Sequence, residues 1–133
     1  MAYISASEHS KAVELALKKG DTSAYNTLSM EFFDSPNEGV FLYTSLKMAN
    51  KYNYGRAYDD AYNCLTNAFH KKVNTELDDL DPETKKLALD LLFRGVKAKN
   101  KNCMSILGNQ YIIGKHLPQD KTKGEKLIEI SNK

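Results

Sequence analysis

The stretch "CMSILGNQYIIGKHLPQDKTKGEKL", residues 103–127, contains two helical segments with a short break between them. Gly114 is typical of a left-handed helix end, because glycine has no Cβ that clashes in that conformation. Pro118 stops the connection, and Asp120 can cap a following helix with its carboxylate. The stretch therefore predicts a helical hairpin, in which a helix over 101–113 is followed by a helix that runs from Asp120 to the carboxyl end.

Similar start and stop signals recur along the rest of the chain. Gly20 ends a first helix and Asp21 caps a second one, while "DSPNEG" at 34–39 breaks the helical pattern. Asp81 before Pro82 is a further start signal, since proline at the first helical position loses no needed hydrogen bond. No stretch alternates like a strand flanked by hairpin turns. The sequence predicts an all-α protein with seven helices, at about 7–20, 21–33, 39–51, 54–71, 82–98, 101–113 and 120–133.

Paired residues repeat at a fixed distance along the chain. Ala24-Tyr25 recurs as Ala57-Tyr58, 33 residues later, close to the period of about 33 to 34 residues found in helical-hairpin repeats. The corresponding pair in the last hairpin, Cys103-Met104, begins 46 residues after Ala57. The acidic loop at 73–81 accounts for the residues by which this separation exceeds 33. We therefore expect one domain over 1–133, an α-α superhelix of about three antiparallel hairpins, with degenerate repeats at about 5–33, 36–72 and 82–133.

Residues 86–127 resemble a Sel-one-like repeat, a tetratricopeptide-like α-solenoid unit. The family's pattern runs alanine, leucine-glycine, tyrosine, glycine, a branched residue before proline, aspartate and lysine-alanine. Without a gap, this chain places at those positions Cys103, Leu107, Gly108, Tyr111, Gly114, Leu117, Pro118, Asp120, Lys123 and Gly124. Upstream, Ala88, Leu89 and Gly95 continue the match. Residues 12–33 and 45–68 match more loosely and are interpreted as degenerate copies.

The chain departs from the family's pattern at three positions. Lys99 stands where a glycine usually ends the helix, His116 where a second glycine is common, and Gly124 where alanine is usual. The resemblance implies a solenoid in which the first helix of each hairpin lines a concave surface that binds extended peptides or partner helices. Glycine at 95 and 108 is expected to allow close helix approach.

The stretch "NYGRAYDDAYN", residues 53–63, places three tyrosines four residues apart on one predicted helix. A tyrosine row beside an apolar seam has two explanations. The rings pack between successive hairpins, or they form an aromatic surface for a partner, since tyrosine suits interfaces. Under the second explanation the partner-binding residues are the aromatic anchors Tyr54, Tyr58 and Tyr62 and the polar rim residues Arg56, Asn63 and Asn109.

Asp59 and Asp60, in the same stretch, raise the question of a metal or acid–base pair. Consecutive helical residues point about 100° apart, so the two carboxylates do not converge, and we expect both to face solvent. His9, His70 and His116 share no ligand spacing, and no nucleophile elbow or phosphate-binding loop is present. We therefore expect no catalytic residue, no metal, no cofactor and no enzymatic activity.

Charge is distributed unevenly along the chain. Residues 1–83 carry 8 basic and 13 acidic residues, a net charge of −5, whereas residues 84–133 carry 11 and 4, a net charge of +7. Solvated helix faces explain this, or an acidic partner docks on the basic half. The overall charge of +2 is too small to indicate nucleic acid. The acidic loop "ELDDLDPE", residues 76–83, lacks the glycine and final glutamate of a calcium loop and is expected to be a solvated connector.

The cysteines and the apolar segments of the sequence bear on the cellular compartment of the protein. Cys64 and Cys103 are interpreted as small apolar residues in a reducing compartment, with a disulfide in an exported protein as the alternative. No signal peptide or membrane-spanning run is visible in the sequence. We therefore expect a cytoplasmic protein that does not bind a membrane.

The predicted function is non-catalytic binding of a peptide or partner protein on the concave face of a short helical solenoid. The alternative is a cytoplasmic immunity or inhibitor protein that neutralises a cognate toxin or enzyme by direct binding. An acidic patch at 76–83 would suit a basic target of that kind.

Overall fold

The computed structural model of the chain describes residues 6–34 and 38–133. The elements are α1 (Ala6–Lys19), α2 (Thr22–Asp34), α3 (Glu38–Tyr52), α4 (Gly55–Thr66), the 3₁₀ helix η1 (Ala68–His70), α5 (Pro82–Lys97), α6 (Lys101–Ile113) and α7 (Lys121–Ser131). These ranges contain no strand, which confirms the all-α prediction for the described residues. Positions 35–37 of the expected break at 34–39 lie outside them.

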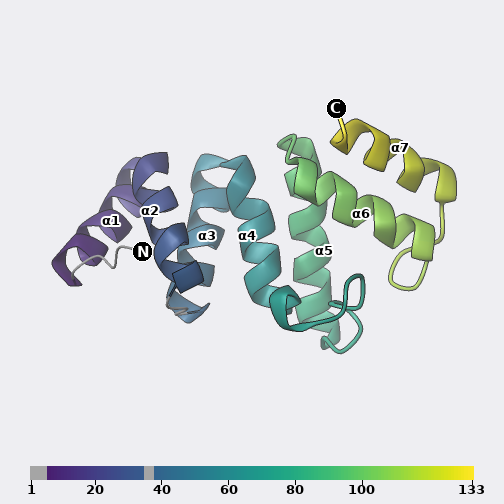
Figure 1. The fold of residues 1–133 in the computed structure, drawn as a ribbon, viewed down its shortest axis with the longest axis horizontal. Helices are drawn as coiled ribbons and strands as arrows, with labels where there is room; N and C mark the ends of the chain where they lie inside the picture. The colour runs from purple at the N-terminus through teal and green to yellow at the C-terminus, as the bar shows by residue number, and fades with distance from the viewer. Residues whose placement is uncertain (1–5, 35–37) are drawn as a thin grey trace.

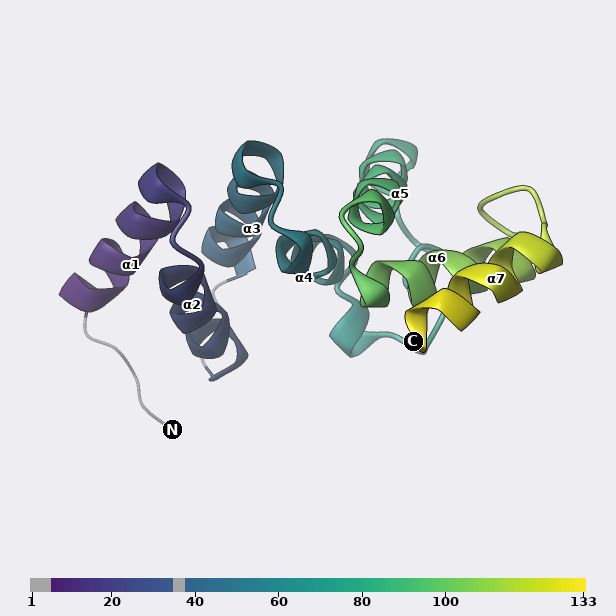
Figure 2. The ribbon, with the colours of Figure 1, turned by 90° about the horizontal axis from the view of Figure 1, so that it is seen from above.

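Consecutive helices pack against one another along the chain, with α1 at one end and α7 at the other (Figure 1). Seen from above, α1, α3 and α5 form one row, and α2, α4 and α6 form a second row beside it (Figure 2). Contacts also join α1 to α3 and α4 to α6 within a row. Because α4 contacts α3, α5 and α6, several of its faces are covered by other helices.

The corner between consecutive helices recurs with the same backbone geometry. Gly20, Asn53 and Lys99 each adopt a left-handed conformation, with φ of 65°, 50° and 63°, and they are separated by 33 and 46 residues. The helix that follows begins at once. In α2, the Asp21 carboxylate accepts a hydrogen bond from the free Ala24 N–H at 3.0 Å. In α6, the Asn100 side-chain oxygen accepts one from the free Cys103 N–H at 2.8 Å.

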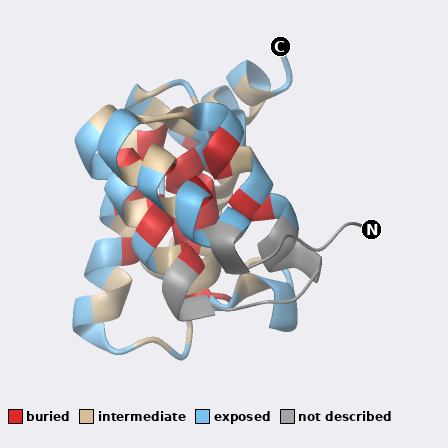
Figure 3. Cartoon of the chain, turned by 90° about the vertical axis from the view of Figure 1, so that its left-hand side faces the viewer, coloured by how far each residue is buried: buried red, intermediate tan, exposed pale blue. Residues whose placement is uncertain are grey.

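The residues three or four positions into each of these helices enter the core. Ala24, Ala57 and Cys103 are buried, and the residues that follow them, Tyr25, Tyr58 and Met104, are buried as well. Figure 3 shows buried segments gathered toward the middle of the molecule, with exposed segments outside. The separations of 33 and 46 residues read from the sequence therefore relate residues in equivalent structural positions.

Glycine allows two helix pairs to approach closely. A Cβ on Gly95 would lie 2.3 Å from the Cys103 sulfur, so α5 and α6 need glycine at this point. Helices α6 and α7 both need glycine where they cross. A Cβ on Gly108 would lie 2.8 Å from the Gly124 carbonyl oxygen, and a Cβ on Gly124 would lie 2.5 Å from the Gly108 carbonyl oxygen. Glycine at 124 thus permits a closer crossing of the two helices than alanine would.

The connection between α4 and α5 differs from expectation. The predicted helix to residue 71 ends at Thr66, because Asn67 adopts a left-handed φ of 56° and its N–H bonds back to the Asn63 and Cys64 carbonyls. Leu77 then enters the core with no exposed surface, and Glu76 is also buried. The expectation of a solvated connector is therefore wrong for this part of the loop.

The acidic residues of this connection are used inside the molecule. Glu76 accepts a hydrogen bond from the Tyr62 hydroxyl at 2.9 Å. Asp78 lies 2.7 Å from the His116 ring and 3.1 Å from the Lys115 amine, and these hydrogen bonds hold the pKa of Asp78 below its usual range. Asp81 caps α5 as expected, by accepting from the Thr84 N–H. The loop is thus attached both to α4 and to the α6–α7 connection.

Replacing Lys99 by glycine is expected to stabilise the protein. A side chain in the left-handed region costs roughly 1 kcal/mol, and glycine removes that cost. Lys99→Gly should therefore raise the free energy of unfolding by up to about 1 kcal/mol in urea denaturation. The matched control, Lys86→Gly within α5, should lower it by about 1 kcal/mol; equal losses in both variants would contradict the assigned corner.

Candidate functional site

The tyrosine row of α4 lies largely inside the protein. Tyr58 is 3% exposed and Tyr62 has no exposed surface. The Tyr58 hydroxyl donates to the Ala49 carbonyl or the Asn53 side-chain oxygen, 3.1 and 2.6 Å away. Both rings are thus packing residues, and the expectation that Tyr58 and Tyr62 present an aromatic surface to a partner is wrong. Tyr54 is half-buried, with its ring edge-on to that of Tyr25 at 5.4 Å.

Asp59 and Asp60 are also buried, at 5% and 7% exposed, so the expectation that both face solvent is wrong. The physical reason is the position of α4. Helix geometry was expected to keep the two carboxylates apart, but Asp59 acts on Asp60 directly, through its charge and a side-chain hydrogen bond, and each acid also bonds a different neighbouring segment. Asp60 meets α2 and α3, whereas Asp59 meets the connection between α5 and α6.

Asp60 is the acceptor in a network that joins three helices. The Tyr25 hydroxyl of α2 donates to Asp60 Oδ2 at 2.5 Å and lies 3.0 Å from the Ser45 hydroxyl of α3. Arg56, one turn earlier on α4, places its Nε 3.6 Å from the same carboxylate oxygen. The pKa of Asp60 is raised to about 7, by burial above all and also by the neighbouring Asp59, while the Tyr25 hydrogen bond and the Arg56 charge act in the opposite direction.

Arg56 extends this network to α2. Its two terminal nitrogens donate to the Asn26 side-chain oxygen at 2.9 Å and to the Ser29 hydroxyl at 3.0 Å. Burial, with the nearby Asp60 carboxylate, raises the pKa of Tyr25 above its usual range, so the hydroxyl stays protonated and available as a donor. These polar contacts fix the start of α4 against α2.

Asp59 holds the start of α6 in a different way. Its Oδ2 accepts from the Asn102 amide at 2.7 Å and from the Asn100 amide at 3.2 Å. Asn100 also lies 2.8 Å from the Gly55 carbonyl oxygen, while its own side-chain oxygen caps α6. The asparagine that begins α6 is thereby bound to the beginning of α4.

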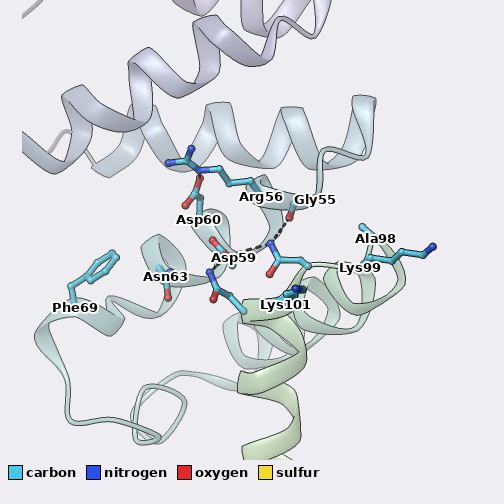
Figure 4. A pocket seen from close by; sticks show the side chains of 11 residues that line it. Gly55, Arg56, Asp59, Asp60, Asn63, Phe69, Ala98, Lys99 and Lys101 are labelled. Carbon is cyan, nitrogen blue, oxygen red and sulfur yellow. Dashed lines mark hydrogen bonds and ion pairs between the residues drawn. The ribbon is translucent and has the colours of Figure 1, made fainter. Parts of the chain in front are cut away.

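A polar depression of about 580 Å³ lies at this junction. It is bordered by the first turns of α4, by η1 and by the connection from α5 to α6 (Figure 4). Its lining residues are Gly55, Arg56, Asp59, Asp60, Asn63, Phe69, Ala98, Lys99, Asn100, Lys101 and Asn102. This size is in the range of ordinary ligand pockets.

The depression brings together only part of the predicted binding residues. Arg56 and Asn63 line it, whereas its lining does not include Tyr54, Tyr58, Tyr62 or Asn109. Sequence reasoning missed the Asn100 and Asn102 wall and the exposed Phe69 ring. The asparagines stand in the stretch "KAKNKN", 97–102, at the junction of two predicted helices, where asparagine before a helix is a capping signal.

The chemistry of the depression is hydrogen bonding and charge. Among the described residues no three His, Cys, Asp or Glu side chains lie together as a metal site would require. The nearest thiol, Cys103, is buried, and burial raises its pKa to about 12, which keeps it protonated and unreactive. The lining therefore offers carboxylates, amides, cations and one aromatic ring for recognition.

Comparison with known proteins found no matching family model, no similar curated protein and no similar solved structure. In the described part of the chain, no helix has both the length and the apolar composition needed to cross a membrane.

Stability should fall with rising pH because of Asp60. An unfolded aspartate titrates near pH 4, whereas the pKa of Asp60 in the folded protein is about 7. Between these values the folded state retains a proton that the unfolded state has released, so the free energy of unfolding decreases as pH rises, and this dependence ends above pH 7.

Asp60→Asn should remove most of this dependence. In urea denaturation at pH 4.5, 6.0 and 7.5, the wild type should lose on the order of 1 kcal/mol or more, and the variant less than half as much. Asp79→Asn, at an exposed position of the acidic loop, serves as the control and should keep the wild-type slope. An unchanged slope in Asp60→Asn would show that the carboxyl group titrates normally.

Proposed function

We propose that this protein is a non-catalytic scaffold that binds a peptide or a partner protein, with the polar depression at the start of α4 as the contact site. The observation that carries the proposal is the depression itself, which is walled by hydrogen-bonding side chains of α4 and of residues 99–102. Amides such as Asn63 and Asn102 both donate and accept, which suits the alternating groups of a peptide backbone.

Two features of the site favour binding at low entropic cost. The walls are held by Asp59, which bonds both Asn100 and Asn102, and by the Arg56 contacts to α2. A preformed site loses little side-chain freedom when a ligand arrives. By contrast, the Asn63 side chain makes no hydrogen bond among the described residues and lies at the depression, so its amide is available to a ligand.

The proposal includes the finer architecture. We interpret the two rows of helices, with their recurring left-handed corners, as a short α-α superhelix of the tetratricopeptide and Sel-one-like type. The separations of 33 and 46 residues between equivalent corners support this interpretation. Cytoplasmic residence is also proposed, with the buried, reduced thiol of Cys103 as its support.

The immunity or inhibitor alternative has less support than the sequence indicated. It relied on an acidic patch at 76–83 that would meet a basic target. Glu76 is buried against Tyr62, and Asp78 is paired with His116 and Lys115. These contacts leave a smaller acidic surface than a patch of five free carboxylates would provide.

Affinity capture with matched variants tests the proposal. Wild-type protein, the double variant Asn63→Ala/Phe69→Ala, and the control Asn109→Ala/Phe93→Ala are immobilised and exposed to a lysate of the source cells. The test pair lines the depression, while the control pair is the same two residue types on α6 and α5, away from it.

A partner should be retained in stoichiometric amounts by the wild type and the control, and at least tenfold less by the test variant. Circular dichroism should show all three folded. Equal retention by all three proteins, or loss in the control alone, would contradict the assignment of the depression as the binding site.

A further inference from the structure

A second hollow lies along the exposed face of α3, in the middle of the row formed by α1, α3 and α5 (Figure 2). Its volume is about 510 Å³, and its lining residues are Tyr43, Leu46, Lys47, Asn50 and Lys51. Because they recur three and four positions apart, they form one stripe along the helix. This α3 stripe shares no residue with the lining of the depression at the start of α4.

The apolar part of the α3 stripe faces solvent. Tyr43 is 54% exposed, and Leu46, one turn later, is only partly buried. Thr44 and Ser45, which stand between them in the sequence, are buried, so α3 turns two small polar residues inward and a tyrosine ring outward. Such a ring beside a hollow offers apolar area and a hydroxyl group, which suits a contact with another molecule.

The charged residues of the α3 stripe are both cations. The Lys47 amine lies 5.6 Å from the centre of the Tyr43 ring. The Lys51 amine donates to the Leu17 carbonyl oxygen of α1 at 3.3 Å, which uses one of its three N–H donors. Neither lysine forms an ion pair with an acidic residue in the part of the chain that the structure describes, so both retain charge and donors for a ligand.

Arg94 reaches the α3 stripe from α5. Its Nη1 donates to the Asn50 side-chain oxygen at 2.6 Å, and its Nε is ion-paired with Asp90 at 2.9 Å. Asp90 is thus already neutralised and brings no uncompensated negative charge to the hollow. The oxygen of the Asn50 amide is occupied by Arg94, which leaves its NH₂ group as a further donor beside the lysines.

We propose that the α3 stripe binds an acidic segment of a partner protein, with carboxylates at Lys47 and Lys51 and an apolar side chain on Tyr43 and Leu46. Charge complementarity selects this occupant, because the free polar groups of the stripe are cations and donors, and a basic segment would be repelled. Tyr43 and Leu46 favour a peptide over an anion that has no apolar part. The inference goes beyond the proposed function, since it adds a second contact surface, on α3.

Titration with short peptides tests the inference. The ¹⁵N-labelled protein is titrated in low salt with acetyl-Glu-Leu-Glu-Glu-Leu-amide, with the peptide in which glutamine replaces each glutamate, with the peptide in which lysine does so, and with inorganic pyrophosphate. The glutamate peptide should cause saturable shift changes at the amides of Tyr43, Lys47, Asn50 and Lys51. The glutamine peptide and pyrophosphate should bind at least tenfold more weakly, and the lysine peptide should leave these amides unshifted.

Lys47→Glu is the test variant, because the Lys47 amine contacts only the Tyr43 ring among the described residues. It should weaken the glutamate peptide at least tenfold and bind the lysine peptide more tightly than the wild type does. Lys126→Glu, at an exposed position of α7, is the control and should leave both affinities within twofold. Urea denaturation should show all three proteins folded.

Four results would each overturn the inference: equal affinity for the glutamate and glutamine peptides, equal or tighter binding of pyrophosphate, an unchanged affinity in Lys47→Glu, or no saturable shift with the glutamate peptide. Loss of binding at the α3 stripe would leave the capture experiment on the depression unaffected, because the two surfaces share no residue.

Discussion

Asp59 and Asp60 are buried side by side on α4, and each must find hydrogen-bond donors on a different helix. A buried carboxylate without donors is strongly unfavourable, so this requirement constrains where the neighbouring helices lie. Asp60 takes the Tyr25 hydroxyl from α2, and Asp59 takes two asparagine amides from the start of α6. The first half of the chain and the second half are therefore both attached to α4 by polar contacts of defined geometry.

Apolar packing alone would leave the helix positions less well specified. Small residues at the helix contacts, such as Ala57, Ala61 and Gly95, allow close approach but have few features that select one register. The buried acids supply that selection, because a shift of one residue would leave a carboxylate unpaired. The same acids border the depression, so the contacts that position α2 and α6 also determine the shape and charge of the candidate binding site.

Several helix ends were predictable, because they depend on local signals. Gly20, Asp21, Asp81 and Gly114 each act through their own backbone conformation or nearest hydrogen bonds, and all four stand at helix ends as expected. The burial of Asp59 was not predictable in this way. It depends on how many neighbours α4 has, which is a property of the whole array and not of "NYGRAYDDAYN".

The residues of the candidate site could likewise be predicted only in part from the sequence. Arg56 and Asn63 were singled out because they adjoin the tyrosines, and they do line the depression. Asn102 comes from a segment distant in sequence, and only the fold brings it beside α4, whereas Phe69 follows α4 directly in η1. Tyr58 and Tyr62 had two explanations, packing between hairpins or a partner surface, because spacing does not distinguish a face that meets a partner from one that meets the next helix.

A double-mutant cycle on Tyr25 and Asp60 measures the central claim most directly. Urea denaturation at pH 8 of the wild type, Tyr25→Phe, Asp60→Asn and the double variant gives the coupling free energy of the pair. A hydrogen bond from a buried hydroxyl to an ionised carboxylate predicts a coupling of roughly 1 to 3 kcal/mol. Additive effects, within about 0.3 kcal/mol, would contradict the account that buried acids on α4 hold the helices in place.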